Sequence, residues 1–375
     1  MSARFLTVVL ERAFNMRDGF GREIDYMRIS VIDSCNLNCY YCNPCDNNEH
    51  CHALNILSVK EVLCIVRAAT RLGIKHFRLT GGEPLLHPQL DEMVLQIKKI
   101  PGVSSVSLTT NAVLLVQHAK WLKEAGIDSI NVSLDTIDAS EYERITKKPL
   151  LEEVKHGINA AIECGIRVKI NVVLTPQTDV VALTRYVAKK GTDIRFIEMM
   201  PVGEGHTNGV EPYKKVIGTL SKLYGEPCRI NTEKTKEINS GNDKRKIPDN
   251  GPAEYYIFPE LGIRVGLIQA IHGKFCDTCN RIRVTADGRL MPCLGSSVTM
   301  DLVPDSWDFA DDVEKDFAIV RALRAAIKAK PRCHNFNDNA VTYTKTTETK
   351  TVETKTTELK AAEVNAARNM SRIGG

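Results

Sequence analysis

The sequence lacks a strong net charge, a long apolar run and a secretion signal, and each absence excludes a class of protein. Its 50 basic and 46 acidic side chains give a net charge of +4, which is too small to indicate a nucleic-acid partner. No apolar stretch approaches the roughly 20 residues that cross a bilayer. Residues 1–20 contain Glu11 and Asp18 and no small-residue cleavage site, so we expect no targeting segment. We therefore expect a cytoplasmic protein with neither a membrane nor a nucleic-acid partner.

Without a secretion signal, the 12 cysteines favour metal binding over disulfides. Two groups each offer three thiols where a four-iron cluster has four corners. The first group, spaced Cys-x3-Cys-x2-Cys, is Cys35, Cys39 and Cys42. The second group is Cys276, Cys279 and Cys293. Two incomplete sets predict metal-centred redox chemistry, because an iron without a protein ligand can bind and reduce another molecule.

Zinc is the alternative for both sets, since a structural zinc site takes four ligands. Cys45 would complete the first set and Cys333 the second, and Cys51 is a further thiol near the first. The Asp287-Gly288 pair predicts a hairpin that returns Cys293 towards the other two cysteines of the second set. That geometry suits either metal, so the spacing by itself leaves both open.

Between about residues 27 and 200 an amphipathic segment ending at a glycine is repeatedly followed by a short β-rich run. Glycine closes a helix in the left-handed conformation, and branched residues then favour a strand. The expected strands are 27–32, 76–80, 105–109, 129–134, 167–174 and 193–199. Ser58-Val59-Lys60-Glu61 is typical of a capping box that opens the first helix. About six βα units predict an α/β fold with a parallel sheet, either a partial barrel or a doubly wound open sheet.

Four polar motifs follow expected strands, at the end of the sheet where functional groups gather in such folds. These are the first cysteine set, Thr80-Gly81-Gly82-Glu83-Pro84, Thr109-Thr110-Asn111 and Ser133-Leu134-Asp135. Gly81 and Gly82 allow the backbone to approach a ligand closely. The shared position of these motifs predicts one site at the carboxyl ends of the strands.

Six basic side chains form a candidate polyphosphate site. They are Arg28, Arg78, Lys169 and Arg195 on expected strands, with Arg281 and Arg283 behind the second cysteine set. A charge in the middle of a strand is costly unless it is paired, and the arginine fork suits phosphate oxygens. An exposed edge-strand position is the alternative for any one of them. Six together favour a polyphosphate over a peptide.

The chain resembles the radical S-adenosylmethionine superfamily and, within it, the GTP 3′,8-cyclase family of molybdenum cofactor biosynthesis. The resemblance runs from about residue 18 to 333 and includes the last two residues. Besides both cysteine sets and the Gly-Gly-Glu-Pro motif, it rests on Asp18-Gly19-Phe20-Gly21-Arg22, Phe77-Arg78-Leu79-Thr80, Ile194-Arg195-Phe196-Ile197-Glu198, Phe275 to Arg283, and Gly374-Gly375. The first cysteine spacing is shared by many reactions, whereas the second set with its two arginines is far narrower.

The resemblance implies a partial (βα)6 TIM-type barrel with a small C-terminal cluster-binding domain and a flexible tail. We expect an N-terminal segment at 1–22, the barrel at 23–225, the second domain at 226–340, a linker at 341–369 and the tail at 370–375. The Thr/Lys/Glu-rich 344–360 stretch has no apolar face, which predicts a disordered linker. In the family the terminal Gly374 and Gly375 enter the active site, although frayed chain ends are the plainer interpretation.

The resemblance also implies two 4Fe–4S clusters, S-adenosylmethionine and GTP. A 5′-deoxyadenosyl radical would remove the ribose 3′ hydrogen, and the carbon radical would attack guanine C8. The implied S-adenosylmethionine contacts are Tyr41, Gly82, Ser133 and Met200, although strand-end packing also explains Ser133 and Met200. The implied GTP contacts are Arg28, Arg78, Thr109, Lys169, Arg281, Ile282 and Arg283. No catalytic residue is assigned beyond the six cluster ligands.

Further implied partners are an electron donor and a downstream pterin-forming enzyme, and the family allows a homodimer. Several positions depart from the family pattern: His76 in place of a lysine, Ala112 in place of a glycine, Asn43 in place of an apolar residue, and the extra Cys45 and Cys51. A radical S-adenosylmethionine enzyme that modifies a peptide is one rival interpretation, and a non-catalytic zinc-binding protein is another. Iron and sulfide content separates the zinc protein from both enzymes.

Overall fold

The computed structural model describes residues 16–42, 55–202, 209–230, 251–296, 298–302, 312–334 and 336. One twelve-stranded sheet runs through these residues in the order β12-β11-β10-β1-β2-β3-β4-β5-β6-β9-β8-β7. Eight consecutive strands, from β10 to β9, are parallel. The predicted α/β fold with a parallel sheet is therefore confirmed.

The first six strands lie in the sheet in chain order, as expected for successive βα units. They are β1 (Tyr26–Ser30), β2 (His76–Thr80), β3 (Ser105–Thr110), β4 (Ser129–Ser133), β5 (Val168–Val173) and β6 (Asp193–Ile197). Each strand begins within one residue of its predicted first residue. The larger differences concern the last residue of the strand. The predicted strand at 27–32, for example, ends at Ser30, and Ile32 only forms an isolated bridge with Ile56.

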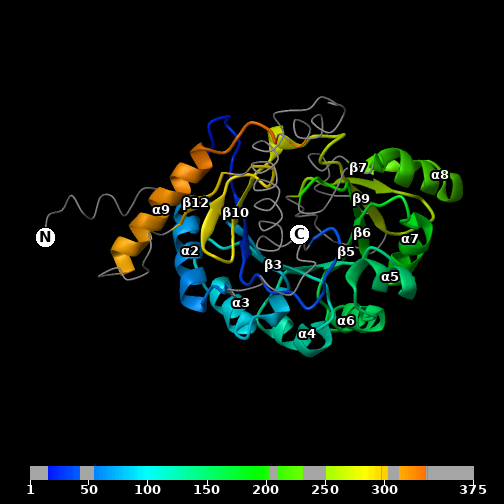
Figure 1. Cartoon of the computed structure of the whole chain (residues 1–375), viewed down its shortest axis with the longest axis horizontal. Helices are drawn as coiled ribbons and strands as arrows, with labels where there is room; N and C mark the ends of the chain where they lie inside the picture. The colour runs from blue at the N-terminus through cyan, green and yellow to red at the C-terminus, as the bar shows by residue number, and fades with distance from the viewer. Residues whose placement is uncertain are drawn as a thin grey trace, which may run out of the picture.

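The helices between these strands cover the outer face of the curved sheet, as Figure 1 shows. They are α2 (Val59–Arg71), α3 (Leu90–Lys98), α4 (Leu115–Glu124), α5 (Ala139–Thr146), α6 (Leu151–Glu163) and α7 (Val180–Lys189), with α8 (Gly218–Tyr224) after β6. The predicted capping box at Ser58 and Glu61 is confirmed. So is the left-handed conformation of the glycines that end α2, α3, α4, α6 and α7. Their apolar stripes pack on the sheet in one continuous core.

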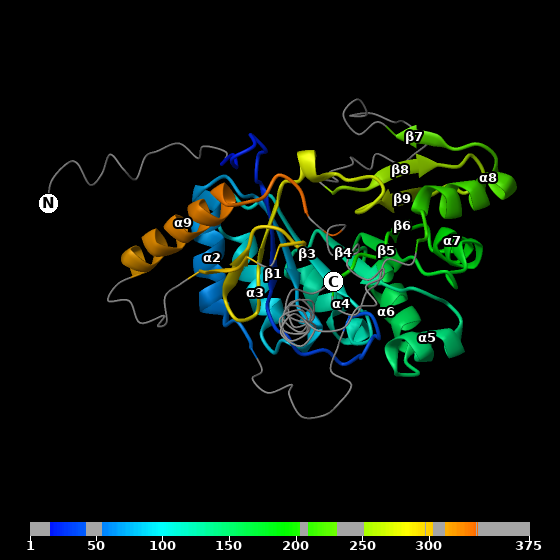
Figure 2. The same ribbon diagram turned by 45° about the horizontal axis from the view of Figure 1, so that its top comes forward.

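The C-terminal part of the chain supplies both ends of the sheet. Its strands are β7 (Cys228–Ile230), β8 (Glu254–Ile257), β9 (Arg264–Ile268), β10 (Arg281–Val284), β11 (Arg289–Met291) and β12 (Met300–Asp301). The β9 strand pairs with β6 and the β10 strand with β1, both in parallel. Figure 2 shows β7, β8 and β9 beyond β6 on the side of α8. Neither of these parallel pairings was predicted, because nothing local in the sequence indicates which distant strand a strand will pair with.

The helix α9 (Asp312–Lys328) lies beside α2 on the outside of the molecule (Figure 1). An ion pair of 2.7 Å joins Arg71 to Asp316 between the two helices. The predicted hairpin at Asp287-Gly288 is confirmed, since β10 and β11 are antiparallel and Gly288 has a φ of 74°. Helix α9 also contacts β11, the second strand of this hairpin.

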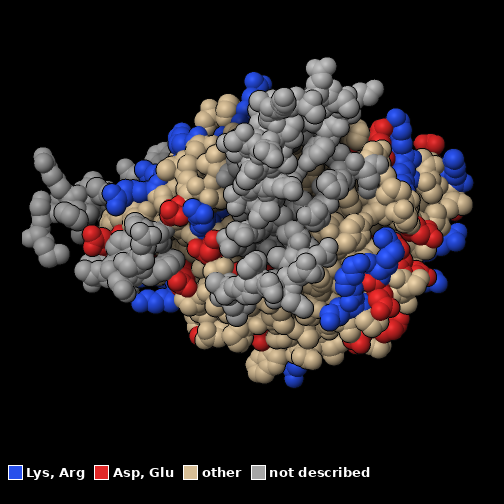
Figure 3. All heavy atoms as spheres, in the orientation of Figure 1, with Lys and Arg blue, Asp and Glu red and all other residues tan. Residues whose placement is uncertain are grey.

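Basic and acidic side chains are interspersed on the face shown in Figure 3. None of the helices in the described ranges combines the length and the apolar character that spanning a bilayer requires.

Candidate functional site

The first cysteine set lies in the loop that follows β1, at the carboxyl end of the sheet. Backbone bonds from Asn38 N to Thr146 O (3.0 Å) and from Tyr40 N to Ile145 O (3.1 Å) tie this loop to the end of α5. The bond from Cys42 N to Cys39 O (2.9 Å) forms a tight turn between two of the cysteines. The loop that carries the thiols is therefore held by main-chain contacts on both sides.

Gly81 and Gly82, which follow β2, pack directly on the backbone of this loop. Gly82 N donates to Ile32 O at 2.8 Å, and Glu83 N donates to Ser34 O at 2.8 Å. A Cβ atom on Gly82 would lie 2.2 Å from Ser34 O, and one on Gly81 would lie 2.4 Å from Ile32 O. Such distances are not tolerated, so both glycines are required by the packing of the cysteine loop itself. The sequence suggested close approach to a ligand, and here the nearest neighbour is protein.

Glu83 connects the ends of β2 and β3 from a buried position. Its carboxylate accepts hydrogen bonds from Thr110 Oγ1 (2.6 Å), Leu85 N (3.0 Å) and Asn111 N (2.7 Å). Burial raises the pKa of Glu83 to about 7, although these three donors favour the charged form. Asn111 in turn lies next to Cys35, with 3.8 Å between its amide nitrogen and the thiol. Glu83 thus fixes one wall of the thiol site.

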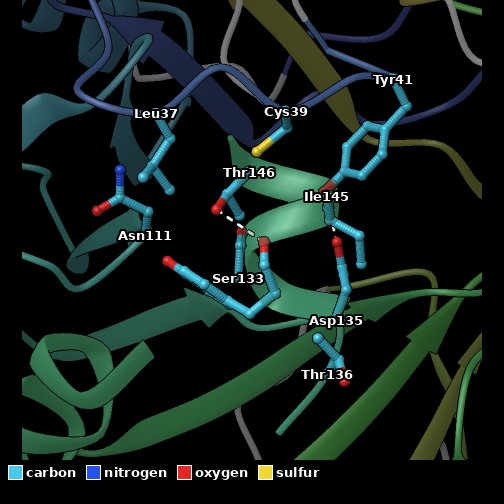
Figure 4. Close-up of a pocket in the computed structure, with 10 residues that line it drawn as sticks. Leu37, Cys39, Tyr41, Asn111, Ser133, Asp135, Thr136, Ile145 and Thr146 are labelled. Atoms are coloured by element: carbon cyan, nitrogen blue, oxygen red, sulfur yellow. Dashed lines mark hydrogen bonds between the residues drawn. The ribbon is translucent and has the colours of Figure 1, made fainter. Parts of the chain in front are cut away.

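Asp135 occupies the corresponding place after β4. Its carboxylate accepts from the Tyr41 hydroxyl at 2.6 Å and from Val173 N at 2.7 Å. Burial raises the pKa of Asp135 to about 6. Figure 4 shows Tyr41 and Asp135 pointing towards each other beneath Cys39. Asp135 therefore anchors the cysteine loop to the ends of β4 and β5.

A hollow of about 340 Å³, including its open mouth, lies between these groups. It is lined by Leu37, Cys39, Tyr41, Asn111, Ser133, Asp135, Thr136, Tyr142, Ile145 and Thr146 (Figure 4). Of the four residues expected to contact S-adenosylmethionine, Tyr41 and Ser133 line this hollow. Gly82 packs on the cysteine loop, and Met200 follows β6, where its carbonyl accepts from Val202 N at 2.8 Å.

The three thiols of the first set are poor anions without a bound cation. Burial raises the pKa of Cys35 to about 12, and the Glu83 charge adds to this rise. Burial and the Asp135 carboxylate raise the pKa of Cys42 to about 11. For Cys39, burial and then the Cys42 and Asp135 charges raise the pKa well above its ordinary value. The thiols influence one another, so they share one site.

The arrangement fits a metal cluster better than a single ion. In the described ranges no three His, Cys, Asp or Glu side chains lie close enough together to hold one metal ion. A cluster has several irons and accepts thiolates that are farther apart, while its positive charge compensates for the buried thiolates. The residues of the first set would hold such a cluster with one corner left to another ligand.

The six candidate cations lie on two groups of neighbouring strands. Arg281, Arg283, Arg28 and Arg78 lie on β10, β1 and β2, and Lys169 and Arg195 lie on β5 and β6. Arg28 pairs in register with Arg78 on one side and with Arg283 on the other. Two residues before Arg28 on the same strand, Tyr26 pairs in register with Arg281, and its hydroxyl accepts a hydrogen bond from Arg78 Nε at 2.5 Å. A TIM-type barrel usually fills these inward positions with branched apolar residues. Guanidinium groups there indicate a polar interior that suits an anion.

The basic side chains of this cluster repel one another, and burial together with this repulsion lowers the pKa values of two of its arginines. Burial, followed by repulsion from Arg283, lowers the pKa of Arg28 well below its ordinary value. Burial and Arg281 lower the pKa of Arg283 to about 10. Burial by itself would raise the pKa of Tyr26, but the charges of Arg78, Arg28 and Arg281 outweigh it and lower the pKa. A polyanion would relieve this repulsion.

The other expected GTP contacts lie around the same interior. Thr109 is buried 3.5 Å from Arg78 Nη1, and Lys169 lies with its Nζ 5.9 Å from the centre of the Tyr255 ring. Arg195 donates from Nε to Asn171 Oδ1 at 2.9 Å. Ile282 alternates with Arg281 and Arg283 and is 1% exposed in the core, so only its backbone is left to contact a ligand.

The second cysteine set lies at the amino end of β10, where the hairpin brings its third member back. Two basic side chains, Lys330 and Arg281, lie close to Cys279. Burial by itself would raise the pKa of Cys279, but Lys330 and Arg281 outweigh it and lower the pKa. Lys330 is buried and donates from Nζ to Arg281 O and to Pro292 O, both at 2.9 Å. This lysine therefore joins the two strands that carry Cys279 and Cys293.

Two positions that depart from the family pattern lie in described parts of the structure. His76 Nδ1 lies 2.8 Å from Ser105 Oγ, and burial lowers the pKa of His76, which favours its neutral form. Ala112 has a φ of 66°, a conformation in which glycine is less strained. Asn43, Cys45, Cys51, Gly374 and Gly375 lie outside the described residues, as does the 344–360 stretch.

Four residues of the site were missed by sequence reasoning: Arg22, Glu83, Asp135 and Lys330. Glu83 and Asp135 stand inside motifs that had been singled out, and their position after a strand was the available signal. Arg22 is buried, pairs with Asp18 at 2.5 Å and donates to Cys276 O at 2.7 Å, across 254 positions of sequence. No local pattern in the sequence indicates the role of Lys330, because its hydrogen-bond partners belong to two other segments of the chain.

Comparison with known proteins covers both parts of the chain. Residues 29–182 match the family model described as the radical SAM superfamily, and residues 192–336 match the one described as molybdenum cofactor synthesis C. A GTP 3′,8-cyclase of Clostridium perfringens is 35% identical over 324 residues, which is 86% of this chain and 95% of that protein. One of Pelotomaculum thermopropionicum is 36% identical over 327 residues, covering 85% of this chain and 95% of that protein.

Among solved structures, Streptococcus suis SuiB with bound S-adenosylmethionine has a TM-score of 0.52 at 15% identity. That match covers 80% of this chain and 65% of SuiB. At this identity the likeness concerns the fold. The two family models together include both cysteine sets and five of the six cations, since Arg28 lies one residue before the first match.

Proposed function

Because this chain belongs to the GTP 3′,8-cyclase family within the radical S-adenosylmethionine superfamily, we propose that it converts GTP to (8S)-3′,8-cyclo-7,8-dihydroguanosine 5′-triphosphate. This lyase reaction is the first step of molybdenum cofactor biosynthesis. The observation that carries the proposal is the row of inward cations on β10, β1 and β2, with one three-cysteine set at each end of these strands. A triphosphate held by the cations would lie between the two sets.

Two 4Fe–4S clusters and S-adenosylmethionine are the cofactors. When bound, they supply the 5′-deoxyadenosyl radical and the electrons that the cyclisation needs. Cys35, Cys39 and Cys42 would hold the first cluster, and Cys276, Cys279 and Cys293 the second. Each set leaves one corner open to another ligand.

This chain's own residues bind, orient and exclude water. We assign S-adenosylmethionine contacts to Tyr41 and Ser133, which line the hollow, and also to Gly82 and Met200. Asp135 orients Tyr41 through the 2.6 Å bond, and Glu83 keeps Asn111 against the cysteine loop. Holding the reacting atoms together and excluding water accounts for much of the rate that a protein can add to radical chemistry.

The arginines and lysine of the interior would bind the nucleotide. We assign this role to Arg28, Arg78, Thr109, Lys169, Arg281, the backbone of Ile282 and Arg283, with Arg195 beside them. Guanidinium groups form paired hydrogen bonds with phosphate oxygens and stay charged even when burial lowers their pKa. His76 is mostly neutral at pH 7, so it would contribute a hydrogen bond rather than a charge.

Further parts of the proposal concern organisation and partners. We retain residues 23–225 as the barrel part and residues 226–340 as the part that holds the second cluster, although their strands share one sheet. We propose that the 370–375 tail reaches the site across the 341–369 linker. An electron donor and a downstream pterin-forming enzyme complete the reaction sequence, and a homodimer is the proposed assembly.

The test is anaerobic incubation of reconstituted protein with GTP, S-adenosylmethionine and a reductant. We expect a cyclised GTP product and 5′-deoxyadenosine in equal amounts. Cys35→Ala should abolish both products, whereas Cys164→Ala, which alters a cysteine outside both sets, should leave both unchanged. Formation of 5′-deoxyadenosine without any GTP-derived product would assign another substrate to the site.

A further inference from the structure

The inner face of β4 carries a buried polar side chain, Asn131, that no described residue satisfies. Its neighbours Ile130 and Val132 belong to the hydrophobic core, so the side chain of Asn131 lies on the opposite, inner face of the sheet. Asn131 is 5% exposed, and its Oδ1 atom is buried without a hydrogen-bond partner among the described residues. An amide oxygen buried in this way costs free energy, so a bound molecule that supplies a donor there gains affinity.

Both in-register neighbours of Asn131 belong to the proposed nucleotide site. Asn131 pairs with Thr109 on β3 and with Lys169 on β5. Paired strands lie about 4.8 Å apart and residues in register share a face, so these three residues form one row of the interior. Ser133, two positions farther along the same face of β4, lines the hollow together with Cys39. Asn131 therefore lies where the proposed nucleotide site adjoins the proposed S-adenosylmethionine site.

The polar groups of both neighbours have partners on the sides away from β4. Thr109 Oγ1 lies 3.5 Å from Nη1 of Arg78, which is on β2. Lys169 Nζ lies 5.9 Å from the ring centre of Tyr255, which is on β8. In the sheet order β2-β3-β4-β5-β6-β9-β8, these two partners stand on opposite sides of β4. Neither neighbour satisfies the Asn131 oxygen, which leaves this atom for a ligand.

The unpartnered oxygen is an acceptor, whereas the basic groups of the interior are donors. Guanidinium and ammonium groups donate to phosphate, whose ionised oxygens accept. An amide oxygen repels phosphate oxygens and attracts an O–H or N–H group of the ligand. GTP offers such donors in its ribose hydroxyls and in its guanine N–H groups. The ribose carries the 3′ hydrogen that the proposed reaction removes, so the ribose must lie next to the S-adenosylmethionine site, where Asn131 stands.

We propose that the side-chain oxygen of Asn131 accepts a hydrogen bond from a ribose hydroxyl of GTP and makes the site selective for nucleotides that carry this hydroxyl. The inference rests on the proposed function, because it takes GTP as the substrate. A nucleotide without the hydroxyl leaves the buried oxygen unpaired. A site built around a hydroxyl rejects such an analogue more strongly than an apolar site does.

The test measures the dissociation constants of GTP, 2′-deoxyGTP and 3′-deoxyGTP by anaerobic calorimetry. The reconstituted chain contains bound S-adenosylmethionine and no reductant, so no reaction occurs. In the parent we expect one of the deoxynucleotides to bind about tenfold more weakly than GTP. Asn131→Leu keeps most of the side-chain volume and removes the acceptor. In this variant GTP should bind about tenfold more weakly, the same deoxynucleotide should bind as in the parent, and the ratio of the two constants should fall to about one.

Asn131→Asp keeps an acceptor oxygen and should retain the tenfold ratio. Ser129→Ala is the matched control, because Ser129 lies two residues earlier on the same face of β4, and it should leave all three constants unchanged. Asn131→Ala provides the same measurement if the leucine variant does not fold.

Equal weakening of all three nucleotides on loss of the amide would overturn the inference, because the amide would then contact phosphate or only support the fold. Equal affinity of the parent for the three nucleotides would overturn it as well. A parent that binds none of them would instead overturn the proposed function and this inference with it.

Discussion

The two cysteine sets differ in the charges that surround them. Beside the first set lie two carboxylates, the buried Glu83 and the half-buried Asp135, which help to raise the pKa values of its thiols. Beside the second set lie Lys330, Arg281 and Arg283, and the pKa of Cys279 is lowered instead. The ligand sets are alike, so the difference comes from residues that are not ligands.

This contrast has a direct consequence for electron transfer. Negative charge near an iron–sulfur cluster stabilises its oxidised form, and positive charge stabilises its reduced form. The first centre is therefore expected to have the lower potential of the two, which suits reduction of a sulfonium. The second centre is expected to accept electrons more readily. One chain can thus keep two chemically similar centres at different potentials.

The largest effect is predicted for Gly82→Ala, which should prevent the first cluster from binding and leave the second cluster in place. In Gly82→Ala the new Cβ would lie 2.2 Å from Ser34 O, so the cysteine loop must move. Iron content should fall from about eight to about four per chain, and cleavage of S-adenosylmethionine should stop. Gly218→Ala is the control, since a Cβ there meets nothing within 4 Å. Full iron content in Gly82→Ala would show that the loop adapts to the added methyl group.

A smaller effect is predicted for Lys330→Met, which should reduce the difference in surrounding charge between the two cysteine sets. Lys330→Met removes the buried cation next to Cys279 while keeping most of the side-chain volume. The reduced form should be disfavoured about tenfold at a given potential, a shift of about 59 mV for one electron. A redox titration followed by electron paramagnetic resonance measures it, with Lys330→Arg expected to restore the potential. The exposed Lys328→Met is the control, and an unchanged potential in Lys330→Met would refute the role of this charge.

A third prediction concerns Asp135 and the pH dependence of stability. Its pKa is about 6 in the folded chain against an ordinary value of 3.8, so its contribution to stability is present below about pH 4 and is lost as the pH rises through 6. Asp135→Asn removes this dependence and preserves both hydrogen bonds, with the Tyr41 oxygen now accepting. Its free energy of unfolding relative to the parent should rise by about 2 kcal/mol between pH 4 and pH 7.

Urea unfolding of the metal-free chain at a series of pH values measures this difference. The exposed Glu124→Gln serves as the control for the loss of one acidic side chain. A parallel pH dependence for Asp135→Asn and the parent would mean that the carboxylate titrates alike in the folded and unfolded chains.

Local features of the sequence predicted much of the barrel. The glycines after the helices, the capping box at Ser58 and the β-rich runs from 76–80 to 193–199 each depend on neighbouring residues, and the structure confirms them. The same holds for the Asp287-Gly288 hairpin. Such signals are strong because the conformational preference and the residue that causes it lie within one turn of chain.

Contacts between distant segments were not predictable in this way. Arg22 meets Cys276 and Arg332, and Lys330 meets Arg281 and Pro292, over separations that no pattern in the sequence encodes. The parallel pairing of β9 with β6 and of β10 with β1 is of the same kind. The cysteine spacing indicated both candidate metal sites, but the charges that distinguish them are not apparent from the sequence, because they come from segments that only the fold brings together.

The order of strands also affects how the chain is made. The β1 and β6 strands leave the ribosome long before β10 and β9, their partners from residues 281–284 and 264–268. Throughout that interval the outer borders of both strands expose unpaired N–H and C=O groups, which are templates for other nascent chains. Chains stopped before residue 264 should therefore associate with one another, and complete synthesis is what protects the newborn molecule from aggregation.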